Sequence, residues 1–186
     1  MHPRINEILE YLDSTRLDLG NAVDGVAATR REERPGPERW SVAEVLEHLA
    51  IIEGRIGKLV ATRIAAAKSA GLGPESDTSP ILDSIDRAKV VDRSRAKTAP
   101  DMLKPQSGAE ATAVWSRLEQ SRAALREAVI SGDGLALSEI KQEHPVLGLI
   151  DLYQWLVFVG SHEARHTAQI REIGSEFSEK SSAASE

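Results

Sequence analysis

Apolar residues recur with the 3.6-residue period of an α-helix in four separate segments of this chain. The clearest segment opens with Ser41-Val42-Ala43-Glu44, where the Ser41 hydroxyl can accept from the Glu44 N–H and the Glu44 carboxylate can reach back. This capping box predicts a helix that starts after Ser41 and ends before Gly71. Because a helix with one apolar face must bury that face, the chain has to fold by packing helices against one another.

Periodic apolar positions predict three more long helices. The first covers roughly residues 4–31, the third opens at a second capping box over residues 107–110, and the fourth runs from about residue 148 to about residue 174. Four amphipathic helices bury their apolar faces most simply as an antiparallel bundle. The expected fold class is therefore all-α, a four-helix bundle.

A long crossover separates the second and third of these helices. Residues 71–107 contain four prolines and interrupt the helical pattern, except at residues 81–91, where a short helix is expected. The bundle domain is expected to cover residues 1–174. Residues 175–186 are rich in Ser, Ala and Glu and are expected to form a disordered tail.

Composition narrows the choice of partners. The chain has 186 residues, of which 41% are hydrophobic and 28% charged, and its 4% aromatic content favours helices over β-sandwiches. A net charge of −6 without a basic block argues against nucleic acid as a partner. The absence of cysteine excludes disulfides, cysteine-bound zinc and a protein thiol nucleophile.

No segment predicts contact with a membrane. Residues 1–5 lead directly into an amphipathic pattern without an apolar signal segment. The longest strongly apolar stretch, Trp155–Val159, is far too short to cross a bilayer. We therefore expect a cytoplasmic protein with no membrane partner.

Three histidines lie on the apolar faces of two predicted helices. His162 and His166 are one turn apart and about 40° apart around the helix, so both rings can point at one spot. His48 lies on the inner face of the second helix, between Val45 and Ile52. Buried imidazoles need partners for their nitrogen atoms, and a divalent cation can serve all three. The pattern predicts a metal site at His48, His162 and His166 with an open coordination position, the alternative being unconnected core or surface histidines.

The other histidines, His2 and His144, are not expected to be ligands. Residues 162–166 also match H-E-x-x-H, the zinc-protease pattern in which the glutamate is the general base. This alternative is weaker because no third ligand follows at a suitable spacing, and the extended protease pattern is absent, with Gln at position 169.

Three further residues are candidates for the site. Gln169 faces the same way as His162, and it either orients a ligand, bridges to bound water, or is a core amide with a backbone partner. Arg55 shares the face of His48, and it either binds an anion or extends to the surface. Glu163 either serves as a base or is an exposed helix carboxylate.

The runs Trp40–Leu49 and His162–Ile170, their separation, and the lead-in His144–Gly148 resemble the DinB-like superfamily over about residues 5–174. The resemblance implies a bundle with an up-down-down-up path and a histidine triad that holds Zn, Ni or a similar ion. It also implies a homodimer. Relatives include thiol-dependent transferases or isomerases, proteins described as metal-dependent hydrolases, and proteins of no known activity.

The leading hypothesis is an enzyme that acts on a small-molecule substrate. A thiol bound at the metal would be deprotonated, and bound water would ionise near neutral pH. Because the chain has no cysteine, any sulfur must come from a low-molecular-weight thiol such as mycothiol, bacillithiol or glutathione. The rival hypothesis is a non-catalytic binding or stress-response module whose metal is structural.

Overall fold

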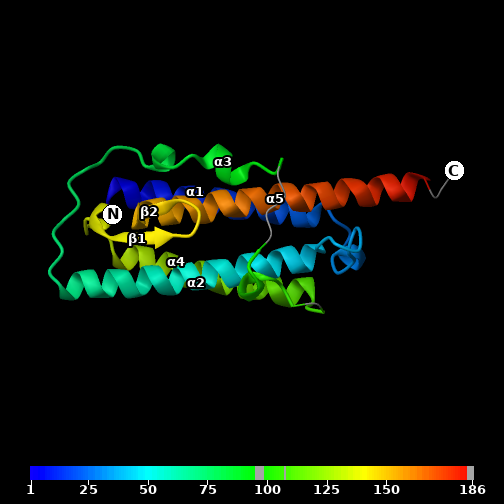
Figure 1. Ribbon diagram of the computed structural model, residues 1–186, viewed down its shortest axis with the longest axis horizontal. Helices are drawn as coiled ribbons and strands as arrows, with labels where there is room; N and C mark the ends of the chain where they lie inside the picture. The colour runs from blue at the N-terminus through cyan, green and yellow to red at the C-terminus, as the bar shows by residue number, and fades with distance from the viewer. Residues whose placement is uncertain (95–98, 107, 184–186) are drawn as a thin grey trace.

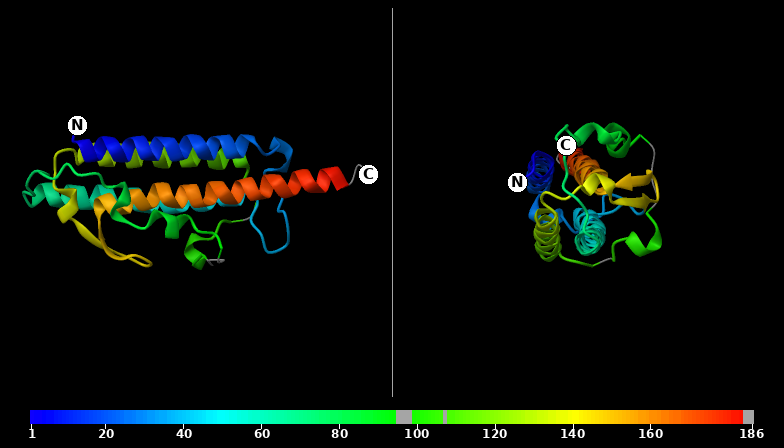
Figure 2. Two further views of the ribbon diagram at one scale, coloured as in Figure 1. Left: turned by 90° about the horizontal axis from the view of Figure 1, so that it is seen from above. Right: turned by 90° about the vertical axis from the view of Figure 1, so that its left-hand side faces the viewer.

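The computed structural model describes residues 1–94, 99–106 and 108–183, and these are mostly helical. The chain runs one way along two long helices and the opposite way along the other two (Figure 1). Seen end-on, the four helices surround a common centre (Figure 2). The expectation of a helical fold class is confirmed. The long helices are α1 (Pro3–Asp24) and α5 (Leu152–Ala183), which run in one direction, and α2 (Val42–Ser69) and α4 (Ala111–Ser131), which run in the other.

Short elements connect the long helices. Within the predicted short helix at residues 81–91, the structure has a 3₁₀ turn followed by α3, which packs against α5. A two-stranded antiparallel hairpin precedes α5. The connecting elements are η1 (Ala28–Arg30), η2 (Leu82–Ser84), α3 (Arg87–Val91), η3 (Asp101–Leu103), η4 (Leu137–Glu139), β1 (Lys141–His144) and β2 (Gly148–Asp151).

The predicted capping box at the start of α2 is confirmed. The Glu44 N–H donates to the Ser41 hydroxyl at 3.2 Å, and the Ser41 N–H donates to the Glu44 carboxylate at 2.8 Å. The first helix is shorter than predicted. It ends at Asp24 because Gly25, a weak helix former, follows, and the Arg31 guanidinium caps the released Val26 carbonyl at 3.0 Å.

The predicted capping box over residues 107–110 is wrong. Ser107 lies outside the described residues, but Gly108 has a φ of +96°, which no α-helix accommodates. Helix α4 therefore begins only at Ala111. Its first N–H is capped from a distant segment, because Ala111 donates to the Glu32 carboxylate at 2.8 Å.

The hairpin was not predicted. It occupies the residues around 148, where the fourth helix was expected to start. Lys141 pairs with Asp151 and His144 pairs with Gly148, whose φ of +73° excludes it from a helix. Helix α5 begins at Leu152 instead. There the Gln154 N–H donates to the Asp151 carboxylate and the Asp151 N–H donates to the Gln154 amide, both at 2.9 Å.

The disordered tail predicted from residue 175 is wrong as far as residue 183. Helix α5 continues to Ala183 because Phe177 is buried, and the Arg30 guanidinium lies 3.8 Å from the centre of its ring. Residues 184–186 of the predicted tail lie outside the described residues. In the described part of the chain, no helix combines the length and the apolar character needed to span a membrane.

A layer of buried charge divides the core into two apolar clusters. Each long helix contributes one charged residue, and each arginine contacts both glutamates at 2.8–3.0 Å. One apolar cluster fills the end where α1 and α5 begin, and the other fills the end where α2 and α4 begin. The layer therefore fixes how far each of the four helices is shifted along its axis relative to the others. Its members are Arg16 on α1, Glu53 on α2, Arg122 on α4 and Glu163 on α5.

Helices α1 and α5 approach closely where Gly160 faces Tyr11. A Cβ atom at Gly160 would lie 2.9 Å from Cδ1 of the Tyr11 ring, whose hydroxyl is hydrogen-bonded to Ser161 at 3.0 Å. We expect Gly160→Ala to lower the free energy of unfolding by about 1–3 kcal/mol, because the ring has to move. Urea unfolding followed by circular dichroism measures this change.

Gly54→Ala is the matched control for that experiment. Gly54 lies inside α2, and a Cβ atom there meets no heavy atom within 4 Å. This substitution should raise the free energy of unfolding by about 0.5–1 kcal/mol. Equal stabilisation by both substitutions would contradict the close approach of α1 and α5.

Candidate metal centre

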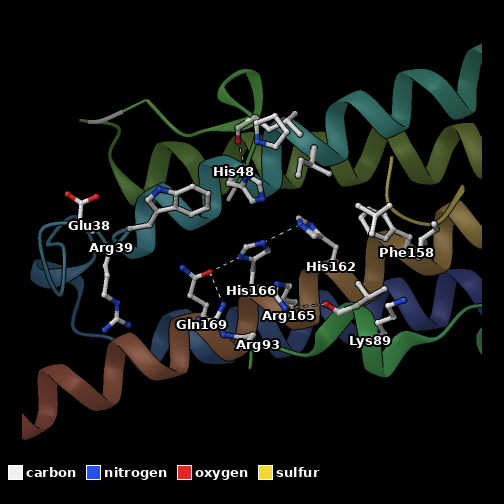
Figure 3. Close-up of a pocket in the computed structure, with 18 residues that line it drawn as sticks. Glu38, Arg39, His48, Lys89, Arg93, Phe158, His162, Arg165, His166 and Gln169 are labelled. Atoms are coloured by element: carbon white, nitrogen blue, oxygen red, sulfur yellow. Dashed lines mark hydrogen bonds between the residues drawn. The ribbon is translucent and has the colours of Figure 1, made fainter. Parts of the chain in front are cut away.

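His48 on α2 faces His162 and His166 on α5 (Figure 3). One ring nitrogen of each histidine lies within 4.8 Å of the corresponding atoms of the other two. His48 and His166 are buried, with 4% and 6% of their surface exposed, and His162 is partly buried. The structure thus brings together all three predicted ligands.

The crossover fixes the orientation and tautomer of His48. Its Nδ1 lies 2.7 Å from the carbonyl oxygen of Leu103. A carbonyl oxygen can only accept, so Nδ1 carries the proton and donates it. The Nε2 atom of the neutral ring is left with a free lone pair, which is the form that ligates a metal.

His166 is fixed in the same way by a chain of polar side chains. Its Nδ1–H donates to Oε1 of Gln169 at 2.8 Å, and that oxygen also accepts from Arg93 at 3.3 Å. Arg93 is held in turn by Glu172 through contacts of 2.9 and 2.6 Å. The Nε2 atom of His166 therefore carries a lone pair, and it lies 3.2 Å from Nε2 of His162.

The three imidazoles are neutral at physiological pH. Burial lowers the pKa of His48, and it lowers the pKa of His162 well below its ordinary value. Burial lowers the pKa of His166 to about 3, with a further contribution from the neighbouring His48. Neutral imidazole is the ligating form, so protons do not compete for the site near pH 7.

This donor set fits a divalent ion. Two nitrogens bound tetrahedrally to one ion at about 2.0–2.1 Å stand about 3.3 Å apart. The Nε2 atoms of His162 and His166 are 3.2 Å apart, and His48 presents a third Nε2 toward them. Three neutral ligands leave the full charge of the ion uncompensated and leave a coordination position open, which is the pattern of catalytic sites.

A cavity of about 490 Å³ opens beside the triad. Trp40 lies against His48 with ring centroids 5.0 Å apart, and Phe158 stacks on His162 at 5.4 Å. These aromatic rings give the cavity apolar walls. The crossover and the hairpin complete the lining with Ala99, Pro100, Leu103, Val146 and Leu147.

Glu163 points away from the triad, into the buried charge layer. It accepts from Arg16 at 2.8 Å, Arg122 at 3.0 Å and Thr15 at 2.6 Å. Only 1% of its surface is exposed, so neither the expected exposed carboxylate nor the protease general base is correct. The histidines and the glutamate of the H-E-x-x-H run therefore lie on different flanks of α5.

Of the other candidates, Gln169 belongs to the site and Arg55 does not. Gln169 lines the cavity and accepts a hydrogen bond from His166, which agrees with the predicted role of orienting a ligand. Arg55 is exposed and donates to Met102 at 3.4 Å, outside the lining of the cavity. The two histidines not expected to be ligands have local roles. His2 caps the Arg4 N–H of α1, and His144 accepts two N–H groups of the hairpin turn.

Sequence reasoning missed Leu103 and Arg93, which support the triad from the crossover. Leu103 acts through its backbone carbonyl, which leaves no signal in the residue type. Arg93 is separated from Gln169 by 76 residues and has no periodic pattern around it. A proline-rich segment too long for a simple connection was the one available signal that this stretch carries function.

The fold and the site define a mostly helical protein with a buried histidine triad that can hold a metal ion. A profile of the DinB superfamily matches residues 11–170, and the chain belongs to this superfamily. A curated relative, the uncharacterized protein YuaE of Bacillus subtilis (strain 168), is 27% identical over 174 residues, which cover 89% of this chain and 96% of that protein. No solved structure matches the chain.

The hydrogen bond from Gln169 to His166 predicts a measurable effect on metal affinity. We expect Gln169→Ala to weaken zinc binding about 10–100-fold, because His166 loses the partner that orients its ring. Competition with a chelating dye measures the affinity. Gln120→Ala, an exposed position on α4, is the control, and equal affinities of the two variants would contradict the orienting role.

The position of Glu163 predicts a structural defect in its variants. Glu163→Ala should lower the free energy of unfolding by about 3–5 kcal/mol, because Arg16 and Arg122 would each lose a buried counter-charge. Glu119→Ala is the control, since this half-exposed partner of Arg16 should cost about 0–1 kcal/mol. Equal stability of the Glu163→Ala and Glu119→Ala proteins would contradict the structural role of the buried charge layer.

Proposed function

We propose that this protein is a metal-dependent enzyme that binds one divalent ion, Zn or Ni, at His48, His162 and His166. The observation that carries the proposal is the approach of the Nε2 atoms of His162 and His166 to 3.2 Å, with the Nδ1 atom of His166 engaged by Gln169. Without an ion, two lone pairs at this distance repel unless His162 places a proton between them. The adjacent cavity supplies room for a substrate.

The reaction that we propose is S-transfer from a low-molecular-weight thiol to an electrophile, with hydrolysis as the alternative. A divalent ion held by the triad would lower the pKa of a thiol or a water molecule bound at its open position. The chain has no cysteine, so the sulfur belongs to a small molecule. Trp40 packs against His48 and Phe158 stacks on His162, and these apolar rings reduce the access of bulk water to the triad.

The path of the helices and the assembly of the protein are also proposals. We interpret the helical arrangement as an up-down-down-up four-helix bundle, the path that the superfamily resemblance implies. A small-molecule substrate, a homodimer and a cytoplasmic location stay predictions from the sequence. Light scattering of the purified protein tests the dimer.

The function is tested with protein purified without an affinity tag and loaded with Zn²⁺ or Ni²⁺. The assay follows thioether formation from 1-chloro-2,4-dinitrobenzene, with and without an added thiol. In this reaction the carbon–sulfur bond forms, chloride leaves and the thiol proton passes to solvent. We expect turnover only when both metal and thiol are present, and we expect His166→Ala to reduce it to the background rate.

His2→Ala is the control variant, since His2 caps α1 far from the triad in sequence and does not line the cavity. Hydrolysis is scored separately with a chromogenic ester such as 4-nitrophenyl acetate, and thiol-independent turnover of the ester would favour a hydrolase. If no electrophile or ester is turned over while His48→Ala still lowers thermal stability in the presence of zinc, the protein is a non-catalytic module with a structural metal.

A further inference from the structure

The wall of the cavity carries positive charge in a chain whose net charge is −6. The neutral triad contributes no negative charge, and a bound divalent ion would add two positive charges. A partly enclosed wall of one sign concentrates ligands of the opposite sign. Among the described residues that line the cavity, Glu38 is the one carboxylate, and the cations are Arg39, Lys89, Arg93 and Arg165.

Two of these cations build the wall itself. Arg165 donates to the backbone carbonyls of Val90 and Asp92, and Arg93 is paired with Glu172, so both hold the crossover against α5. The fold therefore places two guanidinium groups in the lining of the same cavity, where they can attract an anion.

The other two cations differ in their availability to a ligand, because Arg39 is already paired with an acid. Lys89 on α3 is exposed, and it has no ion-pair partner within residues 1–94, 99–106 and 108–183. Arg39 is 41% exposed and contacts Glu176. Lys89 can therefore turn toward a ligand without losing an existing ion pair. Trp40, which packs against His48, and Phe158, which packs against His162, supply apolar surface to the same cavity.

We propose that the cavity binds a small molecule that carries an oxyanion group, such as a carboxylate, sulfonate or phosphate. Lys89 and the guanidinium groups of the wall hold this group, while the apolar part of the molecule lies on Trp40 and Phe158 with its reacting atom at the triad. This inference rests on the proposed function and adds the class of ligand to it. The oxyanion belongs either to the thiol or to the electrophile.

Calorimetric titration of the zinc-loaded protein with acid and amide pairs tests the inference. The thiol pair is 3-mercaptopropionate and 3-mercaptopropionamide, and the electrophile pair is 4-chloro-3-nitrobenzoate and 4-chloro-3-nitrobenzamide. We expect the acid of at least one pair to bind about fivefold more tightly than its amide. The preference should shrink at about 0.5 M NaCl, because salt screens the partly exposed charges.

Lys89→Met should reduce the preference for the acid. Lys58→Met is the matched control, since this exposed lysine of α2 does not line the cavity and should leave the preference unchanged. The pair that shows the preference identifies the molecule that carries the oxyanion.

Two results would overturn the inference and leave the metal site intact. Equal binding of acid and amide in both pairs would show that the wall does not select anions. A preference as large in Lys89→Met as in Lys58→Met would show that Lys89 does not hold the carboxylate. Failure of the protein to bind zinc would instead reject the proposed function.

Discussion

The buried layer of two arginines and two glutamates is the constraint on which the rest of the structure depends. Each long helix contributes one charge, and each arginine is paired with both glutamates. Sliding one helix by a turn would bury an uncompensated charge, which costs several kcal/mol. The layer thereby sets the level of α2 relative to α5. That level places His48 opposite His162 and His166.

Helix α5 contributes to both the buried charge layer and the histidine triad, from two different sides of the helix. Glu163 faces the charge layer between the helices, whereas the histidines on either side of it in sequence face α2 and the cavity. A rigid helix fixed at Glu163 therefore also fixes the two imidazoles. The resemblance of this run to a protease motif arises from two unrelated requirements that meet on one helix.

The crossover is part of the candidate metal centre. Leu103 orients His48, and Arg93 acts through Gln169 on His166, so both supports come from one connection between α2 and α4. Partners of this kind determine the tautomer and orientation of metal ligands. The same segment supplies Lys89 and Arg93 to the cavity wall. The geometry of the candidate metal ligands and the charge of the cavity wall are thus set by the same stretch of chain.

The sequence by itself determined the helical class, the start of α2 and the identity of the histidine triad. These features depend on local rules, since the helical period and the capping box at Ser41 act within a few residues. Only the tertiary structure decided that Glu163 is buried, that Arg55 is outside the site, and that α5 continues past residue 174. Those outcomes depend on partners far away in the sequence, such as Arg122 for Glu163 and Arg30 for Phe177, and no periodic pattern encodes such pairs.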